Sequence, residues 1–135
     1  MEANELMIGD WVGRVFDDKR IDYRQVDWIR TGEIGMRYQK VWAIGCIEPI
    51  PLTAEILEKD GWERDIDKEW EYNNSHILPH YCYQWEKQNV KIEMYAGLEG
   101  FTISLIIGRR FYAVHELQHV LRLYGLDELA DNFKI

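Results

Sequence analysis

Residues 47–60 read IEPIPLTAEILEKD and mark the point where an extended chain gives way to a helix. Pro49 and Pro51 lack a backbone N–H and favour an extended residue before them, so strand pairing should stop here. Thr53 is a good N-cap for the apolar-periodic residues that follow it. The stretch therefore predicts a subdomain boundary and a short helix over 53–60.

Before this boundary, short hydrophobic runs alternate with polar turns, as expected for strands. The residues Thr31-Gly32-Glu33 can form one of these turns. We expect residues 1–50 to form a bent β-rich subdomain, a small barrel of the Src-homology type. The predicted strands are LMIGDWVGRVF (6–16), IDYRQVDWI (21–29) and MRYQKVWAIGCI (36–47).

After the boundary, residues 51–135 predict an antiparallel meander and a C-terminal helix. Apolar and polar residues alternate over 81–86 and 90–95, with a turn at 87–89, and FTISLII (101–107) supplies a third strand. From Val114 the hydrophobic period becomes helical. The predicted fold class is α+β, with the helix packed on the meander and the two halves either separate or sharing one core.

Composition limits the classes of partner. The chain has 135 residues, 47% of them hydrophobic and 30% charged, which is typical of a globular protein with room for one domain or two small subdomains. A net charge of -8 disfavours nucleic acid and anionic membranes as partners. Cys46 and Cys82 form no metal-binding pair, and the chain shows no export signal, so we expect a cytoplasmic protein.

The C-terminal helix carries His115, Glu116 and His119, which match the H-E-x-x-H pattern of zinc peptidases. In such enzymes both histidines bind zinc, the glutamate acts as general base and a third protein ligand completes the site. Arg122 and Gly125 stand where the metzincin pattern requires glycine and histidine. We therefore expect no metal or other cofactor, and keep a zinc-dependent hydrolase as an alternative.

A helical projection separates the faces of this helix. An apolar side is formed mainly by Val114, Leu117 and Leu121, and the opposite side is polar. We therefore expect the polar side to face solvent or an edge, where it could contact a partner or form the rim of a homodimer. Its residues are His115, Gln118, His119 and Arg122.

Two further groups are candidate contact residues. Tyr81, Tyr83 and Trp85 share one strand face and could stack on bases, although packing under the final helix is the favoured interpretation. Arg109 and Arg110 follow a glycine before the helix and could hold an anion or a partner carboxylate. The chain contains neither a G-x-S-x-G elbow nor a P-loop, so acyl and phosphoryl transfer have no support in the sequence.

Three segments carry a resemblance to a known family: NELMIGDWV (4–12), IEPIPLTAEILEKDGW (47–62) and YAVHELQHVLRLYG (112–125). They resemble a family of small uncharacterised bacterial proteins often encoded in prophage and other mobile elements. In that family the last segment reads more like V-H-Q-L-Q-N-L, without the glutamate and second histidine of the zinc motif. The resemblance therefore implies that His115, Leu117 and Gln118 form a structural signature.

Taken together, these patterns predict a non-catalytic protein-interaction module with an unknown protein partner, and the resemblance implies an accessory protein of a phage or mobile element. The alternatives are the zinc-dependent hydrolase and single-stranded nucleic-acid binding through the aromatic residues. A hydrolase requires bound metal and Glu116, whereas nucleic-acid binding requires an affinity that falls steeply with salt.

Overall fold

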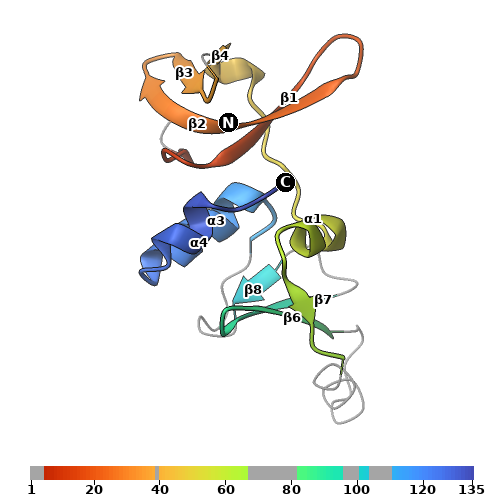
Figure 1. Cartoon of the computed structure of the whole chain (residues 1–135). Coiled ribbons are helices and arrows are strands. Elements are labelled where there is room, and N and C mark those ends of the chain that lie inside the picture. The colour runs from red at the N-terminus through yellow and green to blue at the C-terminus, as the bar shows by residue number, and fades with distance from the viewer. Residues whose placement is uncertain (1–4, 39, 67–81, 96–100, 104–110) are drawn as a thin grey trace. The chain divides into compact units, whose positions relative to one another are not determined.

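The computed structural model describes an α+β protein with two antiparallel four-stranded sheets (Figure 1). The predicted fold class is therefore confirmed at this level. The chain divides into two compact units: the first contains residues 1–51, 113–133 and 135, and the second contains 52–112 and 134. The described residues are 5–38, 40–66, 82–95, 101–103 and 111–135.

The sheet of the first unit is a simple meander in the order β1-β2-β3-β4. Tight turns of polar residues and glycine join its strands, including the predicted turn at Thr31-Gly32, where Gly32 has a φ of 77°. The strands are β1 (Trp11–Val15), β2 (Ile21–Arg30), β3 (Glu33–Met36) and β4 (Lys40–Ala43).

Alternating residues of these strands form the core of the first unit, as a half-buried sheet requires. Trp28 crosses directly over Gly35, where an added Cβ would lie 1.9 Å from the indole, so only glycine fits under this ring. The buried residues of this core are Leu6, Val12, Val26, Ile34, Met36, Trp42 and Ile47.

One backbone bridge links β1 to the chain after β4. The 3-10 helix η2 (Ile44–Cys46) turns the chain, and Glu48 then exchanges two hydrogen bonds with Gly13, of 2.9 and 2.8 Å. This bridge is a single residue pair, and the sheet is not closed. The bent β-subdomain is present, but the predicted barrel is not established.

The C-terminal helices α3 (Val114–Leu123) and α4 (Asp127–Asp131) belong to the first unit. Gly125, with a φ of 75°, ends α3 in the left-handed conformation that glycine tolerates. The sequence predicted that this helix packs on the C-terminal meander, whereas its contacts group it with the N-terminal sheet. The reason is a set of long-range hydrogen bonds between polar groups, described below, which periodicity cannot reveal.

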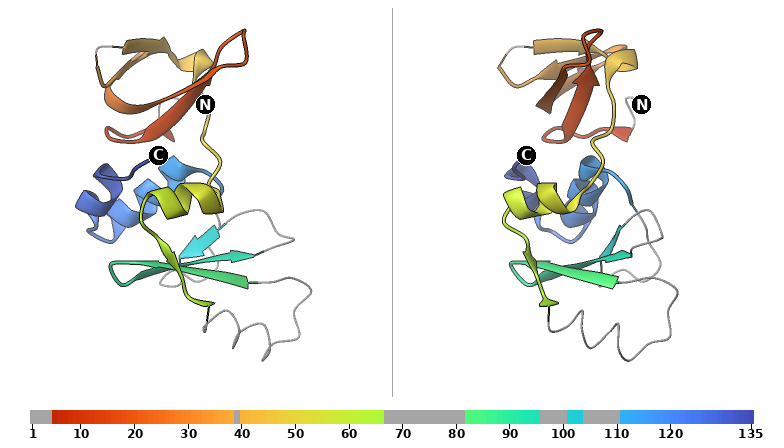
Figure 2. Two further views of the ribbon diagram at one scale, coloured as in Figure 1. Left: turned by 45° about the vertical axis from the view of Figure 1, so that its right-hand side comes forward. Right: turned by 90° about the vertical axis from the view of Figure 1, so that its right-hand side faces the viewer.

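The second unit begins with the predicted short helix, α1 (Ala54–Lys59). Thr53 Oγ1 accepts a hydrogen bond from the N–H of Ile56 at 3.3 Å, and Gly61 follows the helix with a φ of 88°. Helix α1 lies on one side of the second sheet in both views of Figure 2.

The second sheet has the order β5-β6-β7-β8 and contains the predicted meander. Its strands are β5 (Glu63–Arg64), β6 (Cys82–Lys87), β7 (Val90–Tyr95) and β8 (Phe101–Ile103). Gln88 and Asn89, both with positive φ, form the β6–β7 turn near its predicted place.

One predicted strand was wrong. The run at residues 36–47 was expected to be a single strand, but Arg37 and Tyr38 form a turn between β3 and β4. Tyr38 adopts a φ of 67°, which a bulky residue rarely does, so the hydrophobic pattern gave no signal of a turn.

Candidate functional site

The H-E-x-x-H residues lie in the first turns of α3, where Glu116 satisfies the helix end. Its Oε1 accepts the N–H of Ala113, the N-cap residue, at 3.1 Å. The N-cap has no side-chain acceptor of its own, so this bond from the third helical residue compensates in part for the missing cap. Glu116, which would be the general base of a zinc enzyme, therefore has a local structural role.

His115 is buried, with 7% of its surface exposed. Its Nδ1 has no hydrogen-bond partner among the described residues, and its ring meets that of His119 edge-on at 5.5 Å between centroids. Burial lowers the pKa of His115 below its usual 6.5. Asp10 opposes this to a smaller extent, and the nearby His119 acts in the same direction as burial. His115 is thus held in its neutral form.

Asp10, at the start of β1, is the centre of a buried polar cluster. One carboxylate oxygen accepts a hydrogen bond from Arg122 Nη1 at 2.6 Å. The other lies 2.6 Å from His119 Nε2 and accepts the backbone N–H of Met7 at 2.8 Å. We call Asp10, Met7, His119 and Arg122 the Asp10 cluster. It joins the N-terminal segment to α3 across more than one hundred residues of sequence.

Arg122 also reaches α4, which positions both helices. Its Nη2 donates to Asp131 Oδ1 at 3.1 Å. These two side chains pass directly over Gly9, where an added Cβ would lie 2.9 Å from each of them. Gly9 has a φ of 93°, a conformation that favours glycine, and a side chain here would displace the ends of Arg122 and Asp131.

Gln118 is fully buried and all of its usual hydrogen-bonding groups are engaged. Its Oε1 accepts the N–H of Trp11 at 2.9 Å, and its Nε2 donates to the carbonyls of Gly9 and Ala130 at 3.0 and 2.9 Å. Gln25 on β2 repeats this pattern, donating to the carbonyls of Gly9 and Asp131. Two amides therefore connect strands β1 and β2 to α4.

The predicted exposed polar face of α3 was wrong for His115 and Gln118, which are both buried. The side chains of His119 and Arg122 keep only 24% and 12% exposure. The projection identified an apolar side correctly, but β1 and α4 also pack on this helix, and their backbone groups satisfy the polar residues. This face contributes to folding rather than forming an open contact surface.

The geometry bears on the zinc hypothesis. His119 Nε2, which a zinc ion would need, is already bonded to a carboxylate that also holds Arg122. In the part of the chain that the structure describes, no three His, Cys, Asp or Glu side chains are grouped to hold a metal ion. The arrangement is that of a structural cluster in which each carboxylate oxygen has a donor.

The remaining candidate contact residues are the aromatic residues Tyr81, Tyr83 and Trp85 and the pair Arg109 and Arg110. Trp85 on β6 is buried, and its Nε1 has no hydrogen-bond partner among the described residues, while Arg64 lies over its ring at 6.0 Å. Tyr83 also lies on β6, opposite Met94. Tyr81, Arg109 and Arg110 lie outside the described residues.

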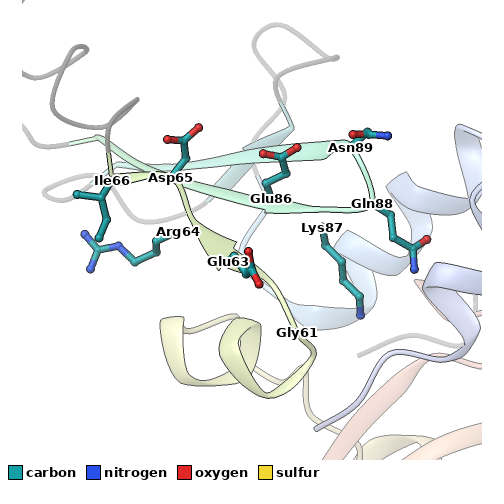
Figure 3. Close-up of a pocket in the computed structure, with 9 residues that line it drawn as sticks. All are labelled: Gly61, Glu63, Arg64, Asp65, Ile66, Glu86, Lys87, Gln88 and Asn89. Atoms are coloured by element: carbon teal, nitrogen blue, oxygen red, sulfur yellow. The ribbon is translucent and has the colours of Figure 1, made fainter.

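The second unit contains a hollow of about 810 Å³ beside β5 and the β6–β7 turn (Figure 3). Glu63 and Glu86 are direct cross-strand neighbours at its wall. Lys87, also at the wall, pairs with the buried carboxylate of Asp60 at 3.2 Å. None of the described lining residues is a histidine, cysteine or serine, so the hollow presents no histidine base and no hydroxyl or thiol nucleophile from these residues.

Asp60 is the second buried acid, and the sequence analysis missed both. Its carboxylate accepts the indole N–H of Trp62 at 2.9 Å and the backbone N–H of Lys134 at 2.7 Å. We call Asp60, Trp62, Lys87 and Lys134 the Asp60 cluster. Asp10 offered a weak signal, because it stands beside Trp11 in an apolar run and a carboxylate buried there needs a hydrogen-bonded partner. Asp60, between Lys59 and Gly61, offered none.

No protein-family model, curated protein or solved structure matches this chain. None of the helices in the described ranges has the length and apolar character needed to cross a membrane. The function is therefore argued from the contacts of the chain itself.

Proposed function

We propose that this protein is a non-catalytic protein-interaction module that works in the cytoplasm as an accessory protein of a phage or other mobile element. The observation that carries this proposal is the use of the H-E-x-x-H residues in the fold. His119 bonds to Asp10, and Glu116 bonds to the N-cap of its own helix. These contacts favour a structural role over metal catalysis.

The exposed apolar residues of the first sheet support a binding role. Val41 is 53% exposed and Tyr38 is 84% exposed in a turn with a φ of 67°. A non-glycine residue held in this conformation costs free energy that the surrounding structure must offset. Displaying an aromatic ring to a partner is a reason to maintain it, since tyrosine gives a large contact area at small entropic cost.

We also propose that the first sheet is a small barrel of the Src-homology type. The reciprocal bonds between Gly13 and Glu48 join the first strand to the chain after the fourth, as closure of such a barrel requires. A barrel of this kind offers a rigid surface with few open edges.

The alternatives have less support. Binding of single-stranded nucleic acid through Tyr81, Tyr83 and Trp85 was kept as an alternative, but Trp85 is only 2% exposed, so its ring is not available for stacking. A zinc hydrolase would have to break the bond between His119 and Asp10 before zinc could bind. A homodimer stays a further form of the interaction hypothesis.

The test uses a photo-crosslinking amino acid placed at Tyr38 or Val41 in the native host, with Glu58 on α1 as the exposed control position. We expect a discrete adduct with another protein from the first two positions, identified by mass spectrometry and absent at the control. Adducts at none of the positions would contradict an interaction role. Stoichiometric zinc in the untagged protein, lost in His119→Ala, would instead support the hydrolase.

A further inference from the structure

The β1–β2 hairpin extends beyond the rest of its sheet, and its end has an open strand edge (Figure 1). Strand β3 pairs only with residues 26–30 of β2, while β1 pairs with residues 21–25. The far part of β2 therefore has one neighbour instead of two. In the described part of the chain, no strand pairs with the outer edge of β2 at Ile21–Arg24.

The hydrogen bonds of β1 show which groups point to this open edge. Gly13 uses both its N–H and its C=O to bond Glu48, on the side of β1 away from β2. When one residue of an antiparallel pair directs its N–H and C=O away from the neighbouring strand, the residue directly opposite does the same on its own strand. Tyr23 stands opposite Gly13, so its backbone groups point to the open edge, and Ile21, two residues earlier, repeats the pattern.

The side chains beside this edge differ between the two faces of the hairpin. Val15, Ile21 and Tyr23 share one face, because Val15 pairs with Ile21 and Tyr23 is two residues along. All three are among the exposed large hydrophobic residues, with Ile21 at 52%. This face is therefore apolar and open to contact.

The opposite face is rich in arginine. Arg14, Asp22 and Arg24 share it, since Arg14 pairs with Asp22 and Arg24 is two residues along. Arg24 Nε bonds to Asp22 at 3.2 Å, so that carboxylate already has a partner. Arg14 makes no ion pair with a described carboxylate.

Phe16 orients two guanidinium groups at the hairpin end. Arg14 and Arg20 each lie over its ring at 4.5 Å from the centroid. The ring is thereby occupied and offers no platform for a nucleic-acid base. A stacked guanidinium keeps its N–H groups in its own plane, where they can bind a carboxylate in a bidentate manner. Arg20 likewise has no ion pair with a described carboxylate.

We propose that the open edge of β2 binds an extended segment of a partner protein by strand addition, and that this segment alternates apolar and acidic residues. Its backbone would bond to Ile21 and Tyr23, its apolar side chains would contact the Val15 face, and its acidic side chains would meet Arg14 and Arg20. This mode gives affinity through main-chain bonds and specificity through alternate side chains. This proposal rests on the proposed interaction function and specifies the kind of segment that the partner protein would supply.

The experiment selects binders from a displayed library of random linear peptides against the full chain. Enriched peptides should alternate acidic and apolar residues. Their affinity should fall at least tenfold in Ile21→Pro, which removes one outward N–H at the first residue of β2, where proline is tolerated. The matched control is Ala43→Pro, at the exposed end of the edge strand β4, where the φ of -66° suits proline, and it should leave affinity within about twofold.

A second pair of variants tests the charge requirement. Arg20→Glu should weaken the selected peptides at least tenfold, whereas Lys40→Glu, the same charge change on β4, should have little effect. Amide exchange at Tyr23 should slow when peptide binds. To show that the sheet is intact in the free Ile21→Pro variant, circular dichroism is combined with amide exchange at Asp22 and Arg24, whose N–H groups face β1.

Three results would overturn the proposal. These are enrichment of no peptide, equal affinity in Ile21→Pro and the parent chain, or a dimer of this chain that Ile21→Pro abolishes. In each case, partner adducts at Tyr38 or Val41 would still support the interaction function. If neither the adducts nor peptide binding were found, both proposals would be contradicted.

Discussion

The Asp10 cluster and the Asp60 cluster place the same group, a fully buried carboxylate, in two different surroundings. Asp10 is met by Arg122, by His119 and by the N–H of Met7. Asp60 is met by Lys87 and by the neutral N–H groups of Trp62 and Lys134. The Asp10 cluster thus contains two side chains that can carry positive charge, and the Asp60 cluster contains one.

The comparison shows what the zinc-like motif does in this chain. A buried charge is costly unless it is paired and hydrogen-bonded. In the Asp10 cluster, His119 supplies one of these hydrogen-bond partners. Both basic side chains that contact Asp10, His119 and Arg122, lie on α3. In the Asp60 cluster Lys87, the last residue of β6, performs the same task without any histidine. The histidine therefore participates in burying a charge, which does not require metal.

The largest effect is expected from removing each acid. Asp10→Ala leaves Arg122 largely buried without its main partner and should lower the free energy of unfolding by about 3–5 kcal/mol. Asp60→Ala should cost less, about 2–3 kcal/mol, because Lys87 is more exposed than Arg122 and can turn to water. Urea denaturation measures both.

The control for this pair is Asp131→Ala, which removes the half-exposed partner of Arg122. Its cost should stay below about 1 kcal/mol, as is usual for exposed ion pairs. Equal losses of unfolding free energy in Asp10→Ala and Asp131→Ala would show that burial of the carboxylate does not determine its contribution to stability.

The next largest loss of stability is expected when the glycines beside the two acids are replaced by alanine. Gly9→Ala introduces a Cβ at 2.9 Å from Arg122 and Asp131, in addition to backbone strain at a φ of 93°. We expect a loss of about 2–3 kcal/mol. At Gly61 the nearest atoms are those of Lys87, 3.8 Å away, so Gly61→Ala should cost only the strain, about 1 kcal/mol. Thermal unfolding would separate them, and a larger loss at Gly61 would contradict the crowding at Gly9.

The same physics explains what the sequence could predict. The helix over 53–60, the meander and the helix from 114 follow from caps and periodicity, which are local. The burial of His115 and Gln118 depends on backbone groups of Gly9, Trp11 and Ala130, which local periodicity cannot locate. The burial of Asp10 was missed for the same reason, because its partners His119 and Arg122 lie more than one hundred residues away.

The pH dependence of stability tests the burial of His115, whose ring meets that of His119 in the Asp10 cluster. The pKa of His115 is lowered by burial, so the unfolded chain binds a proton more readily than the folded chain. Its contribution to stability is present above pH 6.5 and is lost as the pH falls below that value. His115→Leu should therefore show a flatter loss of stability on acidification, by up to about 1.4 kcal/mol per pH unit. Identical slopes in urea denaturation across this range would exclude a neutral buried His115.

The smallest effect is expected at the residue that a zinc enzyme needs most. Glu116→Gln keeps an oxygen that can accept the N–H of Ala113, so the free energy of unfolding should change by less than about 0.5 kcal/mol. Photo-crosslinking from Tyr38 should be unchanged in this variant. Loss of the adduct without loss of stability would point to a functional role for the carboxylate.

The most direct test measures the unfolding free energy of the parent chain and of His119→Ala, each with zinc and with a chelator. We predict that zinc leaves the parent chain unchanged and that His119→Ala is destabilised equally in both conditions, since the histidine acts through Asp10. A parent chain stabilised by zinc, with the gain abolished in His119→Ala, would contradict the structural role and establish a metal site.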